Sequence, residues 1–298
     1  MNRKKSKFIL KSVHLFFIAL LWLSCGDKTE EIVSAEEFNS TTNVIAKIQE
    51  ESTNQILVCA HRGFHKNAPE NSLEAIQKAI EADIDIVEID INTTQDGVLV
   101  LMHDDKINRT TNGNGYVSEY TFLELKEFFL KINDSVTNHK IPTLNEAIEV
   151  AGNNVILNLD IKRVEVAKLV QQLRSRNREH EVFSFIWDKD KIDEILAIDS
   201  LYAVLPLVSS KEEMMNYAQN IPSKLQHFDE QSFNLENMNW AKSNDILVFM
   251  NSLWEIDEDF IQNQFDELDE IIELRPAIIQ TDHPKILIEY LRSKNLHD

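Results

Sequence analysis

The chain has 298 residues, with 30 Lys and Arg against 50 Asp and Glu, and a formal net charge of −20. This charge excludes nucleic acid as a partner, since phosphate backbones bind to positive surfaces. The length suits one large domain with a substantial core, and α/β barrels commonly reach this size as single domains. The sequence sets no oligomeric state.

The first residues have the pattern of an export signal. Five basic residues precede a short apolar run, Leu15 to Leu23, which is too short to span a bilayer easily. The run ends in Leu23-Ser24-Cys25-Gly26, which resembles a bacterial lipoprotein cleavage site. We therefore expect residues 1–24 to be a signal peptide. The mature protein is expected to be exported and lipid-anchored through Cys25 on the periplasmic or cell-surface side; an uncleaved membrane anchor is the alternative.

Residues 25–54 are rich in Glu, Ser, Thr and Asn and contain few apolar side chains. They are predicted to form a flexible acidic spacer, with room for one helical turn around Val44 to Ile48. The folded domain is then expected over 55–298, in contact with a membrane through the N-terminal lipid only. If Cys25 carries lipid, Cys59 has no partner and no disulfide is expected.

From Ile56 onward, apolar runs alternate with amphipathic stretches. Strands are predicted over 56–60, 85–92, 154–161, 181–187, 202–208, 223–229, 245–250 and 275–280. Helices are predicted over 71–82, 164–178, 189–199, 210–219, 234–243, 257–273 and 284–294. This pattern indicates an α/β fold, a closed (β/α)8 TIM-type barrel of parallel strands. A hairpin and a small insertion, about 105–140, follow the second strand. The insertion either forms a lid or only packs against the barrel.

The second predicted strand carries two acids on one face. In a strand, side chains at i and i+2 point to the same side, so Glu88 and Asp90 lie opposite Val87, Ile89 and Ile91. Two neighbouring buried carboxylates are costly unless a cation or a basic partner compensates them. Oxygen ligands alone favour a hard ion such as Mg²⁺ or Ca²⁺. The alternative is an exposed edge strand with solvated acids.

A hairpin is predicted to return the chain to these acids. Asp96-Gly97 between two apolar runs is typical of a two-residue turn, which would pair Asp90 with His103. His61 ends the first predicted strand and is followed by Arg62, whose forked donors suit phosphate. Two histidines, two acids and an arginine are therefore expected to converge on one site.

The order of these motifs resembles the glycerophosphodiester phosphodiesterase family of bacterial lipoprotein type. The first matches are His61-Arg62-Gly63, Pro69-Glu70-Asn71-Ser72, Glu88-Ile89-Asp90 and His103-Asp104. Further matches are Arg109-Thr110-Thr111-Asn112-Gly113, Ile141-Pro142-Thr143-Leu144, Asp160-Ile161-Lys162 and Thr281-Asp282-His283-Pro284. The resemblance covers roughly Leu57 to the C-terminus.

The resemblance implies one divalent metal ion, Mg²⁺ or Ca²⁺, bound by Glu88, Asp90 and Asp160. The family usually has Glu where Asp160 stands, and the shorter side chain means that the metal shifts or that a water bridges the gap. Lys162, two residues further on, is expected either to neutralise a phosphate oxygen or to form a salt bridge with one of the acids.

The resemblance also implies catalytic roles for further residues. His61 and His103 would exchange protons, and Arg62 together with Lys162 would neutralise phosphate. Other candidates contact substrate or surround the metal: Glu70, Trp254 and Phe185. Core packing is the alternative for the aromatic residues. Asn71 is expected to cap the first helix, and His227 is expected to be structural or exposed.

The implied function is metal-dependent hydrolysis of a small glycerophosphodiester to glycerol 3-phosphate and an alcohol. In the family's mechanism the substrate's own glycerol hydroxyl attacks phosphorus, and water then opens the cyclic phosphate. Two alternatives remain at this stage. One is a related barrel phosphodiesterase acting on inositol-type or lysophospholipid substrates, and the other is a non-catalytic binding module of the same fold.

Overall fold

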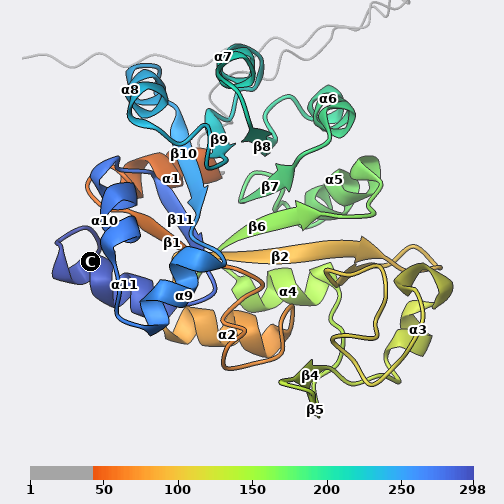
Figure 1. Ribbon diagram of the computed structural model, residues 1–298. Helices are drawn as coiled ribbons and strands as arrows, with labels where there is room; N and C mark the ends of the chain where they lie inside the picture. The colour runs from red at the N-terminus through yellow and green to blue at the C-terminus, as the bar shows by residue number, and fades with distance from the viewer. Residues whose placement is uncertain (1–42) are drawn as a thin grey trace, which may run out of the picture. The chain divides into compact units, whose positions relative to one another are not determined.

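Eight parallel strands alternate with helices and close into a barrel (Figure 1). The computed structural model describes residues 43–298, so the predicted signal peptide, Cys25 and most of the predicted spacer lie outside the described residues. The strands are β1 (Leu57–Ala60), β2 (Ile86–Thr93), β6 (Ile156–Ile161), β7 (Val182–Ile186), β8 (Ala203–Val208), β9 (Leu225–Phe228), β10 (Leu247–Asn251) and β11 (Ile278–Thr281). Because β1 pairs with both β11 and β2, the sheet closes, and the predicted barrel is confirmed.

Helices follow the barrel strands and surround them in Figure 1. They are α2 (Leu73–Glu81), α4 (Leu144–Ala151), α5 (Val166–Arg174), α6 (Lys189–Ile198), α7 (Lys211–Asn220), α8 (Leu235–Ser243), α9 (Glu255–Ile261), α10 (Asp266–Glu273) and α11 (Pro284–Ser293). In residues 43–298 none of the helices has both the length and the apolar character needed to cross a bilayer.

Two helix predictions differ from the structure. The predicted helix over 257–273 is divided into α9 and α10, and Asn263 between them has a left-handed backbone with φ of 58°. Helix α4 was not predicted, although Thr143 and Glu146 form a capping box at its start. Its four buried apolar residues pack into the barrel's main core.

The alternation of side chains along the strands divides the core into two layers. Val58, Val87 and Ile89 point outward and pack with the helices. Leu57 and Ile86 point into the barrel, where they form an apolar plug towards the amino ends of the strands. Further along the same inward rows, the residues become polar: Glu88, Asp90, Asn158, Asp160, His227, Asn251 and Gln280. The fold therefore gathers polar groups at the carboxyl ends of the strands, where barrels hold their active sites.

The predicted hairpin forms, but its register is shifted by one residue. Strand β3 (Leu99–Leu101) runs antiparallel to β2, and Leu101 lies opposite Ile91 rather than Asn92. Only Gly97 has a positive φ, at 78°, whereas a two-residue turn of type I′ needs positive φ at both central residues. The loop therefore has three residues between Thr94 and Val98, whose backbone groups bond at 3.0 Å.

The insertion that follows β3 contains its own small apolar core. Its elements are η1 (Val117–Glu119), α3 (Phe122–Leu125), β4 (Lys131–Ile132) and β5 (Ser135–Val136). Seven buried residues form this core, one from β3 and six from the chain after it: Val100, Met102, Ile107, Val117, Leu125, Leu130 and Ile141. In Figure 1 the β2 arrow points towards this insertion, which places it at the C-terminal end of the barrel.

A helix lies where the sequence predicted the end of a flexible spacer. Helix α1 (Val44–Glu51) begins at Asn43, whose side chain accepts a hydrogen bond from the Ile45 amide. Val44 and Ile48 are buried in the same apolar cluster as Leu57 at the amino end of the barrel. The described part of the predicted spacer is therefore packed against the barrel, and the ordered domain begins before residue 55.

Replacing Ile48 by Ala should destabilise the protein by about 2–5 kcal/mol, because a fully buried isoleucine leaves a cavity under the barrel. Urea unfolding of the purified protein measures this loss. The matched control is Gln49→Ala on the exposed side of α1, which should change stability by no more than about 0.5 kcal/mol. Equal, small effects of both substitutions would contradict the packing of α1.

Candidate active site at the carboxyl ends of the strands

Three carboxylates meet at the mouth of the barrel. Glu88 and Asp90 lie on β2, and Asp160 lies opposite Asp90 on the neighbouring strand β6. One oxygen of each carboxylate lies within 4.8 Å of the others. Glu88 and Asp90 are buried, and Asp160 is partly buried. The residues predicted as metal ligands are therefore assembled in one place.

The hydrogen bonding of Glu88 fits a bound cation. Its Oε2 accepts a hydrogen bond of 2.8 Å from the Arg62 amide. Its Oε1 is buried and has no hydrogen-bond partner within residues 43–298. An unpartnered buried carboxylate oxygen is costly, and a divalent ion would supply the missing partner. A set of three carboxylates suits a hard ion such as Mg²⁺ or Ca²⁺.

Burial and mutual repulsion perturb the three acids in different directions. Burial, followed by the charges of Asp90 and Asp160, raises the pKa of Glu88 well above its ordinary value. Burial also raises the pKa of Asp160, although Lys162 opposes the change. Burial acts on Asp90 in the same sense, but Lys162 and Arg62 outweigh it and lower the pKa of Asp90. The surroundings therefore favour the ionised form most at Asp90.

Two basic side chains compensate this charge. Lys162 Nζ lies 2.5 Å from Asp160 Oδ2 and 3.0 Å from Asp90 Oδ1. Arg62 Nε lies 3.5 Å from Asp90 Oδ2, and Arg62 Nη1 lies 2.9 Å from Glu70 Oε1. The salt bridge between Lys162 and the acids, one of the two roles predicted for this lysine, is therefore present. Both side chains stand beside the carboxylates, where an anionic substrate would meet them.

His61 is held by an aspartate at the end of β11. Its Nδ1 lies 2.8 Å from Asp282 Oδ1, and its Nε2 lies 3.2 Å from Arg62 Nε. Burial opposes ionisation of Asp282, but the bond to His61 and the charges of His65 and Lys66 lower the pKa of Asp282 far below its ordinary value. The ionised carboxylate accepts a hydrogen bond from Nδ1–H, so Nε2 keeps its lone pair and presents it to the site.

A second buried aspartate fixes the position of Asp282. Asp257 Oδ2 accepts a hydrogen bond of 2.6 Å from the Asp282 amide, and Asp257 Oδ1 accepts bonds from the hydroxyls of Thr281 and Ser252. Burial raises the pKa of Asp257 to about 6, although these hydrogen bonds oppose the change. No motif in the sequence marks Asp257, which lies in the helix after β10.

His103 has a similar supporting acid. Its Nδ1 lies 2.7 Å from Asp104 Oδ1, and Arg109 Nε lies 2.8 Å from Asp104 Oδ2. The hydrogen bond from Arg109 lowers the pKa of Asp104 to about 2. The Arg109 guanidinium also contacts both oxygens of Glu70. The residues after β3 are thus connected to the loop after β1.

One residue of the Pro69-Glu70-Asn71-Ser72 motif, Asn71, differs from its predicted role. Ser72, not Asn71, caps α2 by accepting a hydrogen bond from the Ala75 amide. Asn71 has a φ of 54°, and its amide side chain bonds both the carboxylate and the backbone N–H of Asp90. Glu70 joins Arg62 and Arg109 and is not a member of the carboxylate cluster. The motif positions charged groups around the acids.

The site opens into a cavity of about 210 Å³. The predicted residues that line it are His61, Arg62, Glu88, His103, Asp160, Phe185 and Trp254. His227 also lines this cavity, contrary to its predicted structural or exposed position, and so does Asn158. His227 and Asn158 occupy inward-facing positions of β9 and β6. The alternation of side chains along these strands was the sequence signal that could have identified them.

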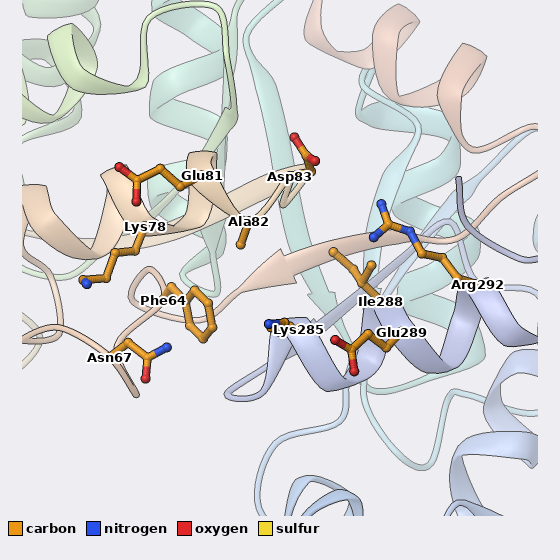
Figure 2. Close-up of a pocket in the computed structure, with 10 residues that line it drawn as sticks. All are labelled: Phe64, Asn67, Lys78, Glu81, Ala82, Asp83, Lys285, Ile288, Glu289 and Arg292. Atoms are coloured by element: carbon orange, nitrogen blue, oxygen red, sulfur yellow. The ribbon is translucent and has the colours of Figure 1, made fainter.

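Another hollow lies between α2 and α11 and has a volume of about 410 Å³ (Figure 2). Lys78, Lys285 and Arg292 line it together with Glu81 and Glu289. It contains no histidine and none of the three clustered carboxylates, so it does not have the groups of the predicted site.

Comparisons with known proteins agree with this geometry. Residues 61–284, most of the chain, match the model of the glycerophosphoryl diester phosphodiesterase family. A glycerophosphodiester phosphodiesterase from Caldanaerobacter subterraneus is 38% identical over 135 residues, which cover 42% of this chain and 56% of that protein. The chain thus spans about half the length of this relative, and less of the human glycerophosphodiester phosphodiesterase 1, of which it covers 34%.

Solved structures extend the comparison over the whole barrel. A glycerophosphoryl diester phosphodiesterase from Parabacteroides distasonis superposes with a TM-score of 0.76 and 28% identity, covering 85% of this chain and 93% of that one. A phosphodiesterase from Oleispira antarctica has a TM-score of 0.66 at 24% identity, covering 80% and 97%, and shares the fold.

Fold and site together define a (β/α)8 barrel with a charged cavity at the carboxyl ends of its strands. Within that class, the chain belongs to the glycerophosphoryl diester phosphodiesterase family.

Adding Mg²⁺ or Ca²⁺ to metal-free protein should raise its unfolding temperature. Saturation at about 100 times Kd corresponds to about 2.7 kcal/mol of added stability. Glu88→Gln should remove this increase, yet in EDTA it should equal or exceed wild type in stability, because it relieves repulsion among buried carboxylates. Calorimetric unfolding with and without metal measures both the rise in unfolding temperature and the stability of Glu88→Gln in EDTA. Glu50→Gln changes an exposed glutamate and is the control, which should keep the metal-dependent rise in unfolding temperature. The same rise in Glu88→Gln would refute the site.

Proposed function

We propose that this protein hydrolyses glycerophosphodiesters to glycerol 3-phosphate and an alcohol. The observation that carries the proposal is the single cavity in which His61, His103 and Arg62 face the clustered carboxylates of Glu88 and Asp160. Family membership supports the same reaction. So does the Oleispira antarctica relative, which was solved in complex with the product sn-glycerol-3-phosphate.

Binding of the phosphodiester would require neutralisation of its charge. Arg62 and Lys162 already stand beside the carboxylates at 3.5 Å or less and can turn towards a phosphoryl oxygen. A divalent ion held by Glu88, Asp90 and Asp160 would polarise the phosphoryl group and stabilise the charge of the transition state. Mg²⁺ and Ca²⁺ both suit these ligands.

Proton transfer would fall to the two histidines. The substrate's glycerol hydroxyl attacks phosphorus and gives its proton to one imidazole, while the other imidazole protonates the leaving alcohol oxygen. A cyclic phosphate results, and water opens it with the proton transfers reversed. Asp282 and Asp104 hold the Nδ1 positions, at 2.8 Å and 2.7 Å, and so keep each Nε2 available for the exchange.

The direct test uses protein purified without residues 1–25. We expect release of glycerol 3-phosphate from glycerophosphocholine, -ethanolamine, -glycerol or -inositol in the presence of Mg²⁺ or Ca²⁺, and loss of activity in EDTA. No release from any of the four by folded, metal-loaded protein would contradict the proposed reaction.

His61→Ala and His103→Ala should each lower kcat by about 10²-fold or more, because each removes a group that transfers a proton. Unfolding temperatures near that of wild type would show that the variants fold. His139→Ala is the control, since this histidine lies in the insertion and lines neither the site nor an adjoining cavity. Turnover like wild type in both site variants would end their catalytic assignment.

We further propose that the protein is exported and anchored through lipid on Cys25. The support is the basic stretch and short apolar run before Leu23-Ser24-Cys25-Gly26. Expressed in a bacterium with lipoprotein processing, wild type should partition into detergent, and its mature N-terminus should carry the mass of a lipid. Cys25→Ser should lose that mass. Lipid found on neither protein, with residues 1–24 retained, would favour the uncleaved anchor.

A further inference from the structure

A second cavity adjoins the one that holds the histidines and carboxylates. This outer cavity has a volume of about 780 Å³ and lies at the carboxyl ends of β8, β9 and β10. It shares four lining residues with the inner cavity: His227, Asn251, Leu253 and Trp254. A substrate whose phosphate is held in the inner cavity therefore has room for its remaining part next to it.

The outer cavity is strongly negative. Asp229, Glu230, Glu255 and Glu267 line it, and no lysine or arginine does. Within residues 43–298 the three glutamates form no ion pair, while nearby acids do, as in the pair of Lys211 with Glu236. Four acidic side chains without a neighbouring cation create a potential that attracts positive groups.

A polar group without a partner lies where the two cavities meet. His227 is 9% exposed, and it forms no hydrogen bond with the described residues. Phe185 and Phe249 form T-shaped contacts with it, with ring centroids 5.3 and 5.1 Å away. Burial lowers the pKa of His227 to about 4, so at neutral pH the ring offers one donor and one acceptor. The ring nitrogens are not sealed off from the two cavities that His227 lines, so they are available to hydrogen-bond a ligand atom there.

The apolar part of the lining suits a compact organic group. Trp254 stands between the cavities and is 73% exposed, so its ring is free to contact a ligand. Tryptophan is the side chain that attracts ammonium groups best through its ring face. The inner cavity differs from the outer one, because the cations Arg62 and Lys162 stand beside its carboxylates and are near enough to meet a phosphate.

We propose that the outer cavity receives the alcohol portion of the substrate and selects headgroups that carry a positive charge. The selected class is small amino alcohols with a primary or quaternary ammonium. The proposal rests on the proposed function, since it assigns the leaving alcohol of that reaction. The phosphate would lie by Arg62 and Lys162, the alcohol chain would pass His227, and the ammonium would lie between Trp254 and the acids.

The test compares kcat/KM for four diesters at low ionic strength. Glycerophosphocholine and glycerophosphoethanolamine have cationic headgroups, whereas glycerophosphoglycerol and glycerophosphoinositol have uncharged ones. We expect at least a tenfold preference for the cationic pair, expressed mainly in KM and reduced by added salt. In the triple variant Glu230→Gln, Glu255→Gln, Glu267→Gln, the ratio between the pairs should fall to within about twofold of unity.

A matched control removes the same charge elsewhere. The variant Glu212→Gln, Glu258→Gln, Glu270→Gln alters three exposed glutamates that line neither cavity, and it should keep the wild-type ratio. Turnover of all four diesters without a charge preference would overturn this proposal alone. An equal loss of preference in both triple variants would overturn it as well, since net charge would then be the cause. Failure to hydrolyse any diester would overturn the proposed function and this proposal with it.

Discussion

The most demanding feature of this structure is the burial of three carboxylates side by side. Closing the barrel places Asp160 next to Asp90 and removes most water from Glu88, so that like charges repel in a medium of low dielectric constant. Each surrounding polar contact reduces that cost. Lys162 and Arg62 bring positive charge, and the side chain of Asn71 and the Arg62 amide donate hydrogen bonds. The remaining oxygen of Glu88 has no hydrogen-bond partner among the described residues, and a cation bound there would compensate its charge.

The two histidines are positioned by a second set of acids around the central carboxylates. Each imidazole contacts a carboxylate that lies outside the central cluster, Asp282 for His61 and Asp104 for His103. These two acids have pKa values below their ordinary range, whereas burial raises the pKa of Glu88. One barrel mouth thus contains carboxylates with two different tasks. Those on β2 and β6 can bind a cation, and those after β3 and β11 orient the two histidines.

Much of this arrangement could be predicted from the sequence because it follows from strand periodicity. The i, i+2 spacing placed Glu88 and Asp90 on one face, and the same spacing in β6 placed Asp160 in line with them. Features that depend on irregular backbone could not be predicted in this way. Asn71 reaches Asp90 because its backbone is left-handed, and the hairpin register depends on a single positive φ at Gly97. A helical turn was predicted around Val44 to Ile48, but its packing against the barrel was not, because Ile48 is buried by residues distant in sequence.

The insertion between β3 and α4 has a consequence for how such a protein can change during evolution. It packs around its own seven-residue core, and Arg109 joins it to the loop after β1 through Glu70. Changes of length or sequence on its outer side therefore leave the carboxylates of β2 and β6 in place. Natural variation or laboratory recombination can reshape the rim of the cavity there, while the chemistry beneath stays as it is.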